Sequence, residues 1–254
     1  MGINYYFMGE FTAALEAEER AQAIGEAIGD PRIQHYAGWT RGMIHTACSD
    51  WETAVALCQR GLDDSKDLVN TAVALGFLGS AYLEQGDAAR AIPLLEEAVR
   101  QWHQFQYRPL QGWIPSWLSE ALLLDGQLDK ARGVARQGLA FSRGCQFWHE
   151  AGLAQRVLGR IAQATGAFTE AARHLQAALE TFTSIQSRFE AGRTHLDLVA
   201  LAHAQGHQEA AATHLHTAHA VFTALQVPRY VERAAQLAGV YGVALAEVSQ
   251  EGMR

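Results

Sequence analysis

One interval recurs along this 254-residue chain and limits what the chain can fold into. A residue suited to ending a helix stands at Gly9, Ser49, Gly86, Gly126, Gly166 and Gly206, at intervals of 40, 37, 40, 40 and 40 residues. Five residues after each of these positions comes an alanine: Ala14, Ala54, Ala91, Ala131, Ala171 and Ala211. A register kept this often predicts a stack of similar units, each of which buries its apolar face against its neighbours.

The stretch at 75–99, LGFLGSAYLEQGDAARAIPLLEEAV, contains one such unit almost in full. Apolar residues recur at helical spacing over 75–82. Gly86 then tolerates the positive φ of a helix end, and Asp87 is a favourable N-cap for a second helix. A new apolar stripe begins at Ala91. The unit is therefore predicted to be a helical hairpin of about 40 residues.

This register divides the whole chain into repeats. We expect an incomplete repeat at 1–28, hairpins at 29–66, 67–106, 107–144, 145–186 and 187–226, and a C-terminal capping helix at 227–248 that ends near Glu247. Because each hairpin packs mainly on its neighbours, the stack is predicted to form one continuous solenoid at 1–254 without separate domains.

The unit resembles the tetratricopeptide repeat, whose pattern is W-x2-L-G-x2-Y followed by A-x3-F. Four residues match this pattern, and two leucines stand in place of its aromatic residues: Leu78, Gly79, Tyr82 and Ala91 match, and Leu75 and Leu95 are the replacements. The resemblance implies an all-α, right-handed superhelical solenoid of such hairpins. It also implies that the first helix of each pair lines the concave face.

Four stretches carry a closer resemblance: GDPR at 29–32, the unit at 75–99, the segment at 152–186 and LQVPRYVERA at 225–234. They are similar to the C-terminal repeat regions of bacterial signal-transduction ATPases and ATPase–cyclase fusions, and to the sensor repeats of the maltose-regulon-activator type. In those families the repeats bind a partner or inducer and restrain an ATPase. The sequence contains no G-x-x-x-x-G-K-[ST] phosphate loop, so it resembles the sensor arm alone, as a fragment or a stand-alone protein.

Composition narrows the function further. With 49% hydrophobic and 19% charged residues, the chain can bury a sizeable core and is too apolar for disorder. It has no apolar run long enough to span a membrane, and we expect no secretory signal peptide. The formal net charge of -7 argues against a general nucleic-acid partner, although recognition of single-stranded RNA by repeats stays open.

The cysteines bear on localisation. Cys48, Cys58 and Cys145 are odd in number and form no C-x-x-C pair. Such cysteines are typical of reduced structural thiols, so we expect a cytoplasmic protein.

The predicted concave face is the main candidate binding surface. By register with the repeat, its residues are Tyr36, Trp39, Met43, Phe77, Trp113, Trp117, Glu120, Arg156, Arg160, Arg193 and Asp197. Aromatic residues dominate its first half and arginines its second. Trp, Tyr and Arg most often anchor interfaces, and an extended peptide with apolar side chains and one acidic group would suit this surface. Alternatively, the aromatic residues fill gaps between neighbouring helices and the arginines lie on a solvated face.

A metal-binding site is less favoured by the sequence than a binding surface for a partner. Histidines gather at His203, His207, His214, His216 and His219, but no carboxylate clearly converges on them, and zinc requires three or four convergent ligands. No metal site and no cofactor are therefore predicted.

Catalysis has little support either. Cys48 lies near His45, and Ser49 near Asp50, at a turn that needs small polar residues for structural reasons. No nucleophile motif accompanies these pairs, so we predict no catalytic residues.

The N-terminal end is a second candidate surface. A second helix that lacks its full partner would expose Phe11, Leu15 and Ile24. Exposed apolar patches favour association, so homodimerisation through this end is expected, unless a preceding segment covers it.

These observations favour a non-enzymatic scaffold that binds protein or peptide in its concave groove and acts as a regulatory or sensor module. A repeat domain that senses a small molecule is the first alternative, and an enzyme built on the same scaffold is the second.

Overall fold

The computed structural model describes residues 2–65, 67–102, 104 and 112–245. These residues contain thirteen helices: α1 (Gly2–Met8), α2 (Phe11–Ile28), α3 (Pro31–Ala47), α4 (Trp51–Asp63), α5 (Leu68–Glu84), α6 (Ala88–Trp102), α7 (Trp113–Leu124), α8 (Leu128–Gly144), α9 (Trp148–Ala164), α10 (Phe168–Ser184), α11 (Arg188–Ala204), α12 (Gln208–Ala224) and α13 (Pro228–Tyr241). No strand occurs among them. None of these helices is long and apolar enough to cross a membrane.

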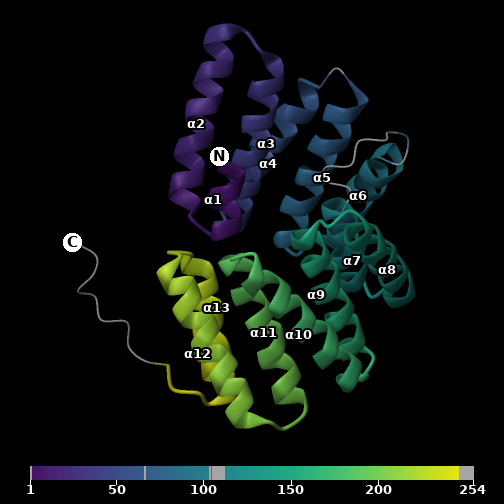
Figure 1. Cartoon of the computed structure of the whole chain (residues 1–254), viewed down its shortest axis with the longest axis vertical. Helices are drawn as coiled ribbons and strands as arrows, with labels where there is room; N and C mark the ends of the chain where they lie inside the picture. Colours follow the sequence, from purple (N-terminus) through teal and green to yellow (C-terminus); the bar gives the residue numbers. More distant parts are fainter. Residues whose placement is uncertain (1, 66, 103, 105–111, 246–254) are drawn as a thin grey trace, which may run out of the picture.

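Successive helices pack as antiparallel hairpins that stack side by side (Figure 1). The helices from α3 to α12 fall in pairs within the predicted ranges from 29–66 to 187–226, and α13 follows as a single helix. The prediction of an all-α, right-handed solenoid of helical hairpins is confirmed.

The turns within the hairpins lie where the register places them. All six positions adopt positive φ: Gly9 82°, Ser49 64°, Gly86 84°, Gly126 81°, Gly166 74° and Gly206 76°. The alanines five residues later are at most 2% exposed. Close approach explains the small residues opposite them, because a Cβ on Gly79 would lie 2.6 Å from the Leu95 side chain.

The last helix is shorter than predicted. It ends at Tyr241, where Gly242 adopts a left-handed conformation with φ of 66° and its N–H bonds the carbonyl of Ala238. A glycine in this conformation is a common helix stop, so the helix does not continue through residues 242–245, and the expected end near Glu247 lies outside the described residues.

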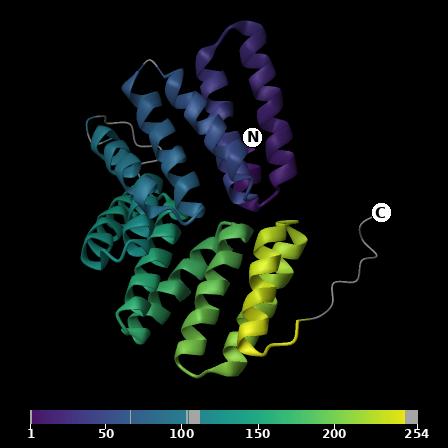
Figure 2. The ribbon, with the colours of Figure 1, turned by 180° about the vertical axis from the view of Figure 1, so that it is seen from behind.

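The two ends of the solenoid meet, which the sequence did not predict. The ring of Phe11 on α2 packs edge-on to that of Phe189 on α11, with centroids 5.2 Å apart. Glu10 Oε1 lies 3.6 Å from Arg188 Nη1, and the Arg229 guanidinium of α13 lies 3.6 Å over the Trp51 ring of α4. The two views in Figures 1 and 2 agree that the first and last helices lie next to one another.

This closure corrects the expected apolar patch at the N-terminal end. Phe11 is only 5% exposed, because Tyr6 of α1 and Phe189 of α11 pack against its ring, and Leu15 packs against the same core cluster. Ile24 remains 56% exposed, since it lies farther along α2. The predicted dimer therefore loses its central contact residue and stays a prediction.

Candidate functional site

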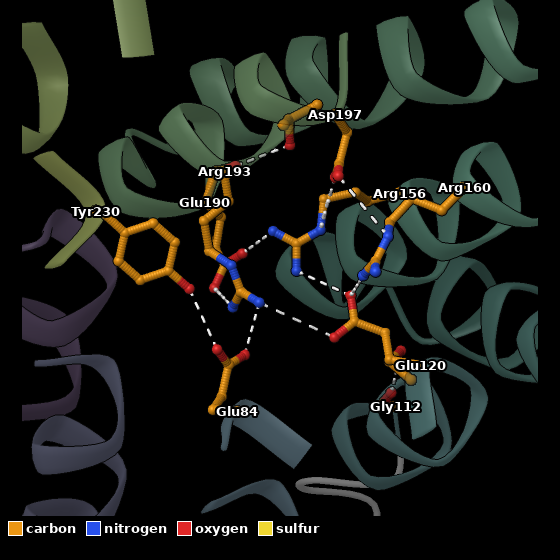
Figure 3. A network of polar contacts seen from close by, with 11 residues as sticks. Glu84, Gly112, Glu120, Arg156, Arg160, Glu190, Arg193, Asp197 and Tyr230 are labelled. Atoms are coloured by element: carbon orange, nitrogen blue, oxygen red, sulfur yellow. Dashed lines mark hydrogen bonds and ion pairs between the residues drawn. The ribbon is translucent and has the colours of Figure 1, made fainter. Parts of the chain in front are cut away.

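A network of charged side chains lies where the odd-numbered helices converge on the concave face (Figure 3). Helices α9 and α11 supply most of it, because their residues repeat at helical spacing on one face. The members are Glu84 of α5, Glu120 of α7, Arg156 and Arg160 of α9, Glu190, Arg193 and Asp197 of α11, and Tyr230 of α13.

Arg156 is the centre of this network and is only 2% exposed. Its Nη1 donates to Glu190 Oε2, and its Nη2 donates to Glu120 Oε1 at 3.3 Å. Its Nε lies 3.9 Å from Asp197 Oδ2. A buried guanidinium is tolerated when carboxylates surround it in this way, because their attraction offsets the cost of removing it from water.

Two further arginines extend the network toward solvent. Arg160 Nη1 donates to Glu120 Oε1 at 3.1 Å, and its side chain is 34% exposed. Arg193 Nη2 donates to Glu84 Oε1 at 2.6 Å. The second oxygen of Glu84 accepts a hydrogen bond of 3.2 Å from the Tyr230 hydroxyl. Helices far apart in the sequence are thereby tied together at this face.

The electrostatics of the network keep two of its carboxyl groups, Glu120 and Glu190, ionised. Burial alone would raise the pKa of Glu120, but the charges of Arg156 and the two other arginines outweigh it and lower that pKa to about 2. Glu190 behaves alike: burial opposes ionisation, yet Arg156 and Arg193 lower its pKa. Glu120 and Glu190 are therefore ionised at neutral pH.

A hollow of about 220 Å³ opens beside the network, and we call it the concave hollow. Its polar wall consists of Glu84, Glu120, Arg156, Arg160, Arg193, Asp197, Tyr230 and Arg233. Arg233 is exposed at this wall and forms no ion pair with a described residue. The concave hollow thus presents one cation that is not already neutralised by an adjacent acid.

The aromatic half of the predicted surface is filled rather than open. Trp113 lies under α1, with its ring centroid 5.6 Å from that of Phe7 and 6.5 Å from that of Tyr6. His149 also contacts Phe7, at 4.5 Å between centroids. Burial lowers the pKa of His149 to about 4, so this imidazole is neutral at physiological pH. Helix α1 therefore occupies the centre of the groove.

The structure places the eleven predicted surface residues in two groups. Buried members are Trp39, Met43, Phe77, Trp113, Glu120 and Arg156, whereas Trp117, Arg160, Arg193 and Asp197 are partly exposed and Tyr36 is exposed. The gap-filling interpretation holds for Trp113 and Phe77. The solvated-face interpretation is wrong for Arg156, because three acids enclose it. A role of these residues in binding stays a prediction.

Four residues of the site were missed from the sequence: Glu84, Glu190, Tyr230 and Arg233. Glu190 could have been found, because it precedes Arg193 by three residues on the same helical face. Glu84 and Tyr230 gave no such signal. Their contact joins residues 146 positions apart and depends on closure of the solenoid.

The other chemical candidates do not form a site in the described residues. No group of three or more His, Cys, Asp or Glu could hold a metal there. His45 Nδ1 lies 3.0 Å from Asp50 Oδ2, and burial raises the pKa of Cys48 to about 11. A raised pKa is the opposite of what an activated thiol nucleophile needs.

Comparison with known families agrees with this architecture. Residues 35–104 match one tetratricopeptide repeat model, and residues 116–137 and 192–217 match another. The chain contains tetratricopeptide repeats. A search of curated protein sequences gives no significant match.

Solved structures of other repeat proteins share the fold of this repeat chain. A Rap protein complexed with competence and sporulation factor aligns with a TM-score of 0.74 at 13% identity, over 95% of this chain and 71% of that one. PlcR of Bacillus thuringiensis, in complex with the peptide PapR7 and DNA, gives 0.59 at 12% identity, over 75% and 73%. A signal transduction ATPase with a tetratricopeptide repeat sensor from Pyrococcus horikoshii gives 0.58 at 17% identity, over 86% and 36%.

Proposed function

We propose that this tetratricopeptide repeat chain is a non-catalytic regulatory or sensor module that binds a protein or peptide on its concave face. The observation that carries the proposal is the concave hollow, where Arg233 is exposed and unpaired beside the partly exposed Arg160 and Asp197. Arginine and tyrosine often anchor protein interfaces. An acidic side chain or a terminal carboxylate of a peptide would pair with Arg233.

The network gives this surface a fixed shape. Arg156 and Glu120 are held by several partners each, so little side-chain entropy is lost when a ligand binds beside them. The similarity in fold to PlcR, whose structure contains a peptide, supports the same class of ligand here. The aromatic residues under α1 would become available only if α1 moved.

The proposal also includes a cytoplasmic location and a homodimer. Cys48, Cys58 and Cys145 are free thiols, which supports a cytoplasmic location. Ile24 and Ile28 are exposed on α2 and could contribute to a homodimer. Light scattering on a concentrated sample would test the dimer, and a monomer at every concentration would exclude it.

The proposed site is tested by capturing partners from a lysate with three forms of the chain. They are the wild type, Arg233→Glu, which reverses the unpaired charge, and Arg143→Glu, which reverses an exposed charge on α8. A partner that is captured by the wild type and Arg143→Glu but lost by Arg233→Glu supports the concave hollow. Equal capture by all three forms would place the interface elsewhere. A thermal-shift screen of small molecules would then test the sensor alternative.

A further inference from the structure

A second and larger hollow lies away from the charged network, between α2, α3 and α4. Its volume is about 470 Å³, within the range of small-molecule sites in proteins. We call it the α2–α4 hollow, and its lining includes Gln22, His35, Gly38, Arg41, Arg60 and Gly61. The missing side chain of Gly38 leaves space, because a Cβ there would meet nothing within 4 Å, and Gly61 lines the hollow from the facing helix.

The repeat register shows that Arg41 is an anomaly. In the four later hairpins the equivalent position is occupied by Leu78, Leu118, Leu158 and Leu198. All four leucines are buried core residues. Only the α3–α4 hairpin places a charged side chain at this leucine position of the repeat.

His35 is a second anomaly in the same hairpin. The equivalent residues are Ala72, Gly112, Gly152 and Gly192. In two of these hairpins the small residue is required by a phenylalanine from the second helix, since a Cβ on Gly152 would lie 2.6 Å from the Phe182 ring and one on Gly192 3.0 Å from the Phe222 ring. The α3–α4 hairpin has Ser65 in place of that phenylalanine, which leaves room for the imidazole.

Each of these two side chains has one buried nitrogen that is not satisfied within the protein. Arg41 Nε and His35 Nδ1 are buried and have no hydrogen-bond partner. A buried polar atom without a partner costs free energy, so such atoms are uncommon in folded proteins. The leucine and the small residue, alanine or glycine, of the other hairpins would pack in the core without this cost.

The charges that face the hollow favour an anion at its inner end. Arg32 is engaged, because it donates two hydrogen bonds to Asp30. Asp67 is engaged too, since its carboxylate caps α5 through Asn70. Arg41 and Arg60 form no ion pair with a described residue.

One acid remains, and the helix directions place it at the end of the hollow away from Arg41 but one turn from Arg60. Asp64 follows the end of α4, beside the start of α3. Arg41 lies one to three helical turns farther along α3 than Arg32 and His35. Arg41 therefore lies away from Asp64, whereas Arg60 precedes Asp64 by four residues on α4, so a bound anion would compete with Asp64 for Arg60 but not for Arg41.

We propose that the α2–α4 hollow binds a small molecule through a carboxylate or phosphate group, which is held by Arg41 and Arg60 beside His35. Guanidinium groups bind both oxyanions through paired N–H donors. The same volume leaves room for a hydroxyl or amine of the ligand to donate to Asp64. This site does not share a residue with the concave hollow.

Isothermal titration with sodium phosphate, and separately with sodium succinate, tests the proposal in the full chain at constant ionic strength. We expect saturable binding of at least one probe with a Kd of ~1 mM or tighter. Arg41→Leu should weaken this binding at least about tenfold, and Arg60→Leu should weaken it too. Arg41→Leu restores the residue of the other hairpins, so it should fold, and a circular dichroism melt checks this. Arg143→Leu, an exposed arginine on α8, is the matched control.

Each outcome decides the matter. Loss of binding in Arg41→Leu, with binding retained in Arg143→Leu, supports the site, and the tighter probe identifies the oxyanion. Equal affinity in Arg41→Leu and wild type, or no saturable binding of either probe, overturns it. Binding that is lost in Arg233→Glu but kept in Arg41→Leu also overturns it and assigns the anion to the concave hollow, so the two sites are tested separately.

Discussion

The α2–α4 hollow and a second hollow between α6, α7 and α8 occupy the same place in the repeat, 77 residues apart. Six residues that line the first hollow have an equivalent in the lining of the second, 77 positions later. The pairs are Gln22 and Val99, Gly38 and Pro115, Leu57 and Val134, Arg60 and Gln137, Gly61 and Gly138, and Asp64 and Phe141. The first hollow measures about 470 Å³ and the second about 180 Å³. The backbone of the repeat thus supplies the space, and the side chains decide whether it suits an anion or an apolar group.

The charged network also contains a buried arginine, and it can be compared with the two hollows. Arg156 is buried like the inner part of Arg41, yet acids of three other positions surround it. Nε lacks a hydrogen-bond partner in both arginines, but both Nη atoms of Arg156 donate to carboxylates, whereas Arg41 forms no ion pair with a described residue. A buried cation held by acids stabilises the packing of neighbouring helices, and one without an acid points to a ligand. Five substitutions or conditions would break or sharpen this distinction.

Leu118→Arg should have the largest effect. Leu118 in the α7–α8 hairpin is the equivalent of Arg41 in the α3–α4 hairpin, so this substitution gives both hairpins an arginine at the same position. Leu118, however, belongs to the hydrophobic core. We expect a loss of on the order of 4 kcal/mol in the free energy of unfolding, because an unpaired charge replaces a buried leucine. Urea denaturation measures this. If Leu118→Arg were as stable as the wild type, the position would tolerate arginine in general and Arg41 would carry no functional meaning.

Glu120→Gln should have the second-largest effect on stability. It removes the acid that contacts Arg156 and Arg160 while keeping the shape of the side chain. Breaking a buried ion pair from one side costs about 3 kcal/mol. The control is Glu96→Gln, at an exposed position of α6. Equal stability of both variants would show that the network contributes little.

Lowering the pH should reduce the stability that the charged network contributes. Glu120 has a folded-state pKa of about 2 against a usual 4.5, so its contribution is complete above pH 4.5 and is lost as the pH falls toward 2. A shift of this size corresponds to about 3 kcal/mol, the most that this one group can contribute. The stability difference between wild type and Glu120→Gln should therefore shrink over that window. A constant difference from pH 5 to 2 would contradict the assignment.

Arg41→Leu should raise stability modestly. It replaces a side chain with an unpartnered buried nitrogen by the leucine of the other hairpins. We expect a gain of about 1 kcal/mol, or roughly 2–4 °C in Tm, in buffer free of carboxylates and phosphate. Differential scanning calorimetry measures the change. A clear loss of stability would mean that the guanidinium is satisfied within the protein.

The smallest effect compares two corresponding glycines. A Cβ on Gly138 would meet only Pro115, at 3.5 Å, whereas one on Gly61 would lie 3.2 Å from the Trp39 ring. Gly138→Ala should therefore gain about 0.5–1 kcal/mol from helix propensity, and Gly61→Ala should gain less. Thermal melts of the two variants rank them. The reverse order would show that the hollow between α6, α7 and α8 is packed more tightly around its glycine than the α2–α4 hollow is.

Local features of this fold could be predicted from the sequence, because they repeat. Gly86 and Ser49 were identified as turns from their spacing, and both adopt positive φ. The buried alanines followed from the same register. Each of these features depends on residues within one hairpin, so the sequence of that hairpin was sufficient.

Features that join distant repeats could not be predicted. The exposure of Phe11 was misjudged because Phe189 covers it from the other end of the chain. Glu84 was missed because its partner Arg193 lies 109 residues away. The structure brings several of the predicted surface residues together, since Arg156 and Arg160 share a helix face and both donate to Glu120. Their degree of burial depended on superhelical curvature, which no short pattern encodes.

The contact between the first and last helices changes how such a chain should come apart. In an open stack, the terminal units have one neighbour each and fray first, so unfolding proceeds inward. Here α2 and α4 are held by α11 and α13 through Phe189 and Arg229. The terminal units have neighbours on both sides, as in a closed belt. We therefore expect the repeats to unfold together as one cooperative unit, and loss of the contact between the ends to restore fraying from the termini.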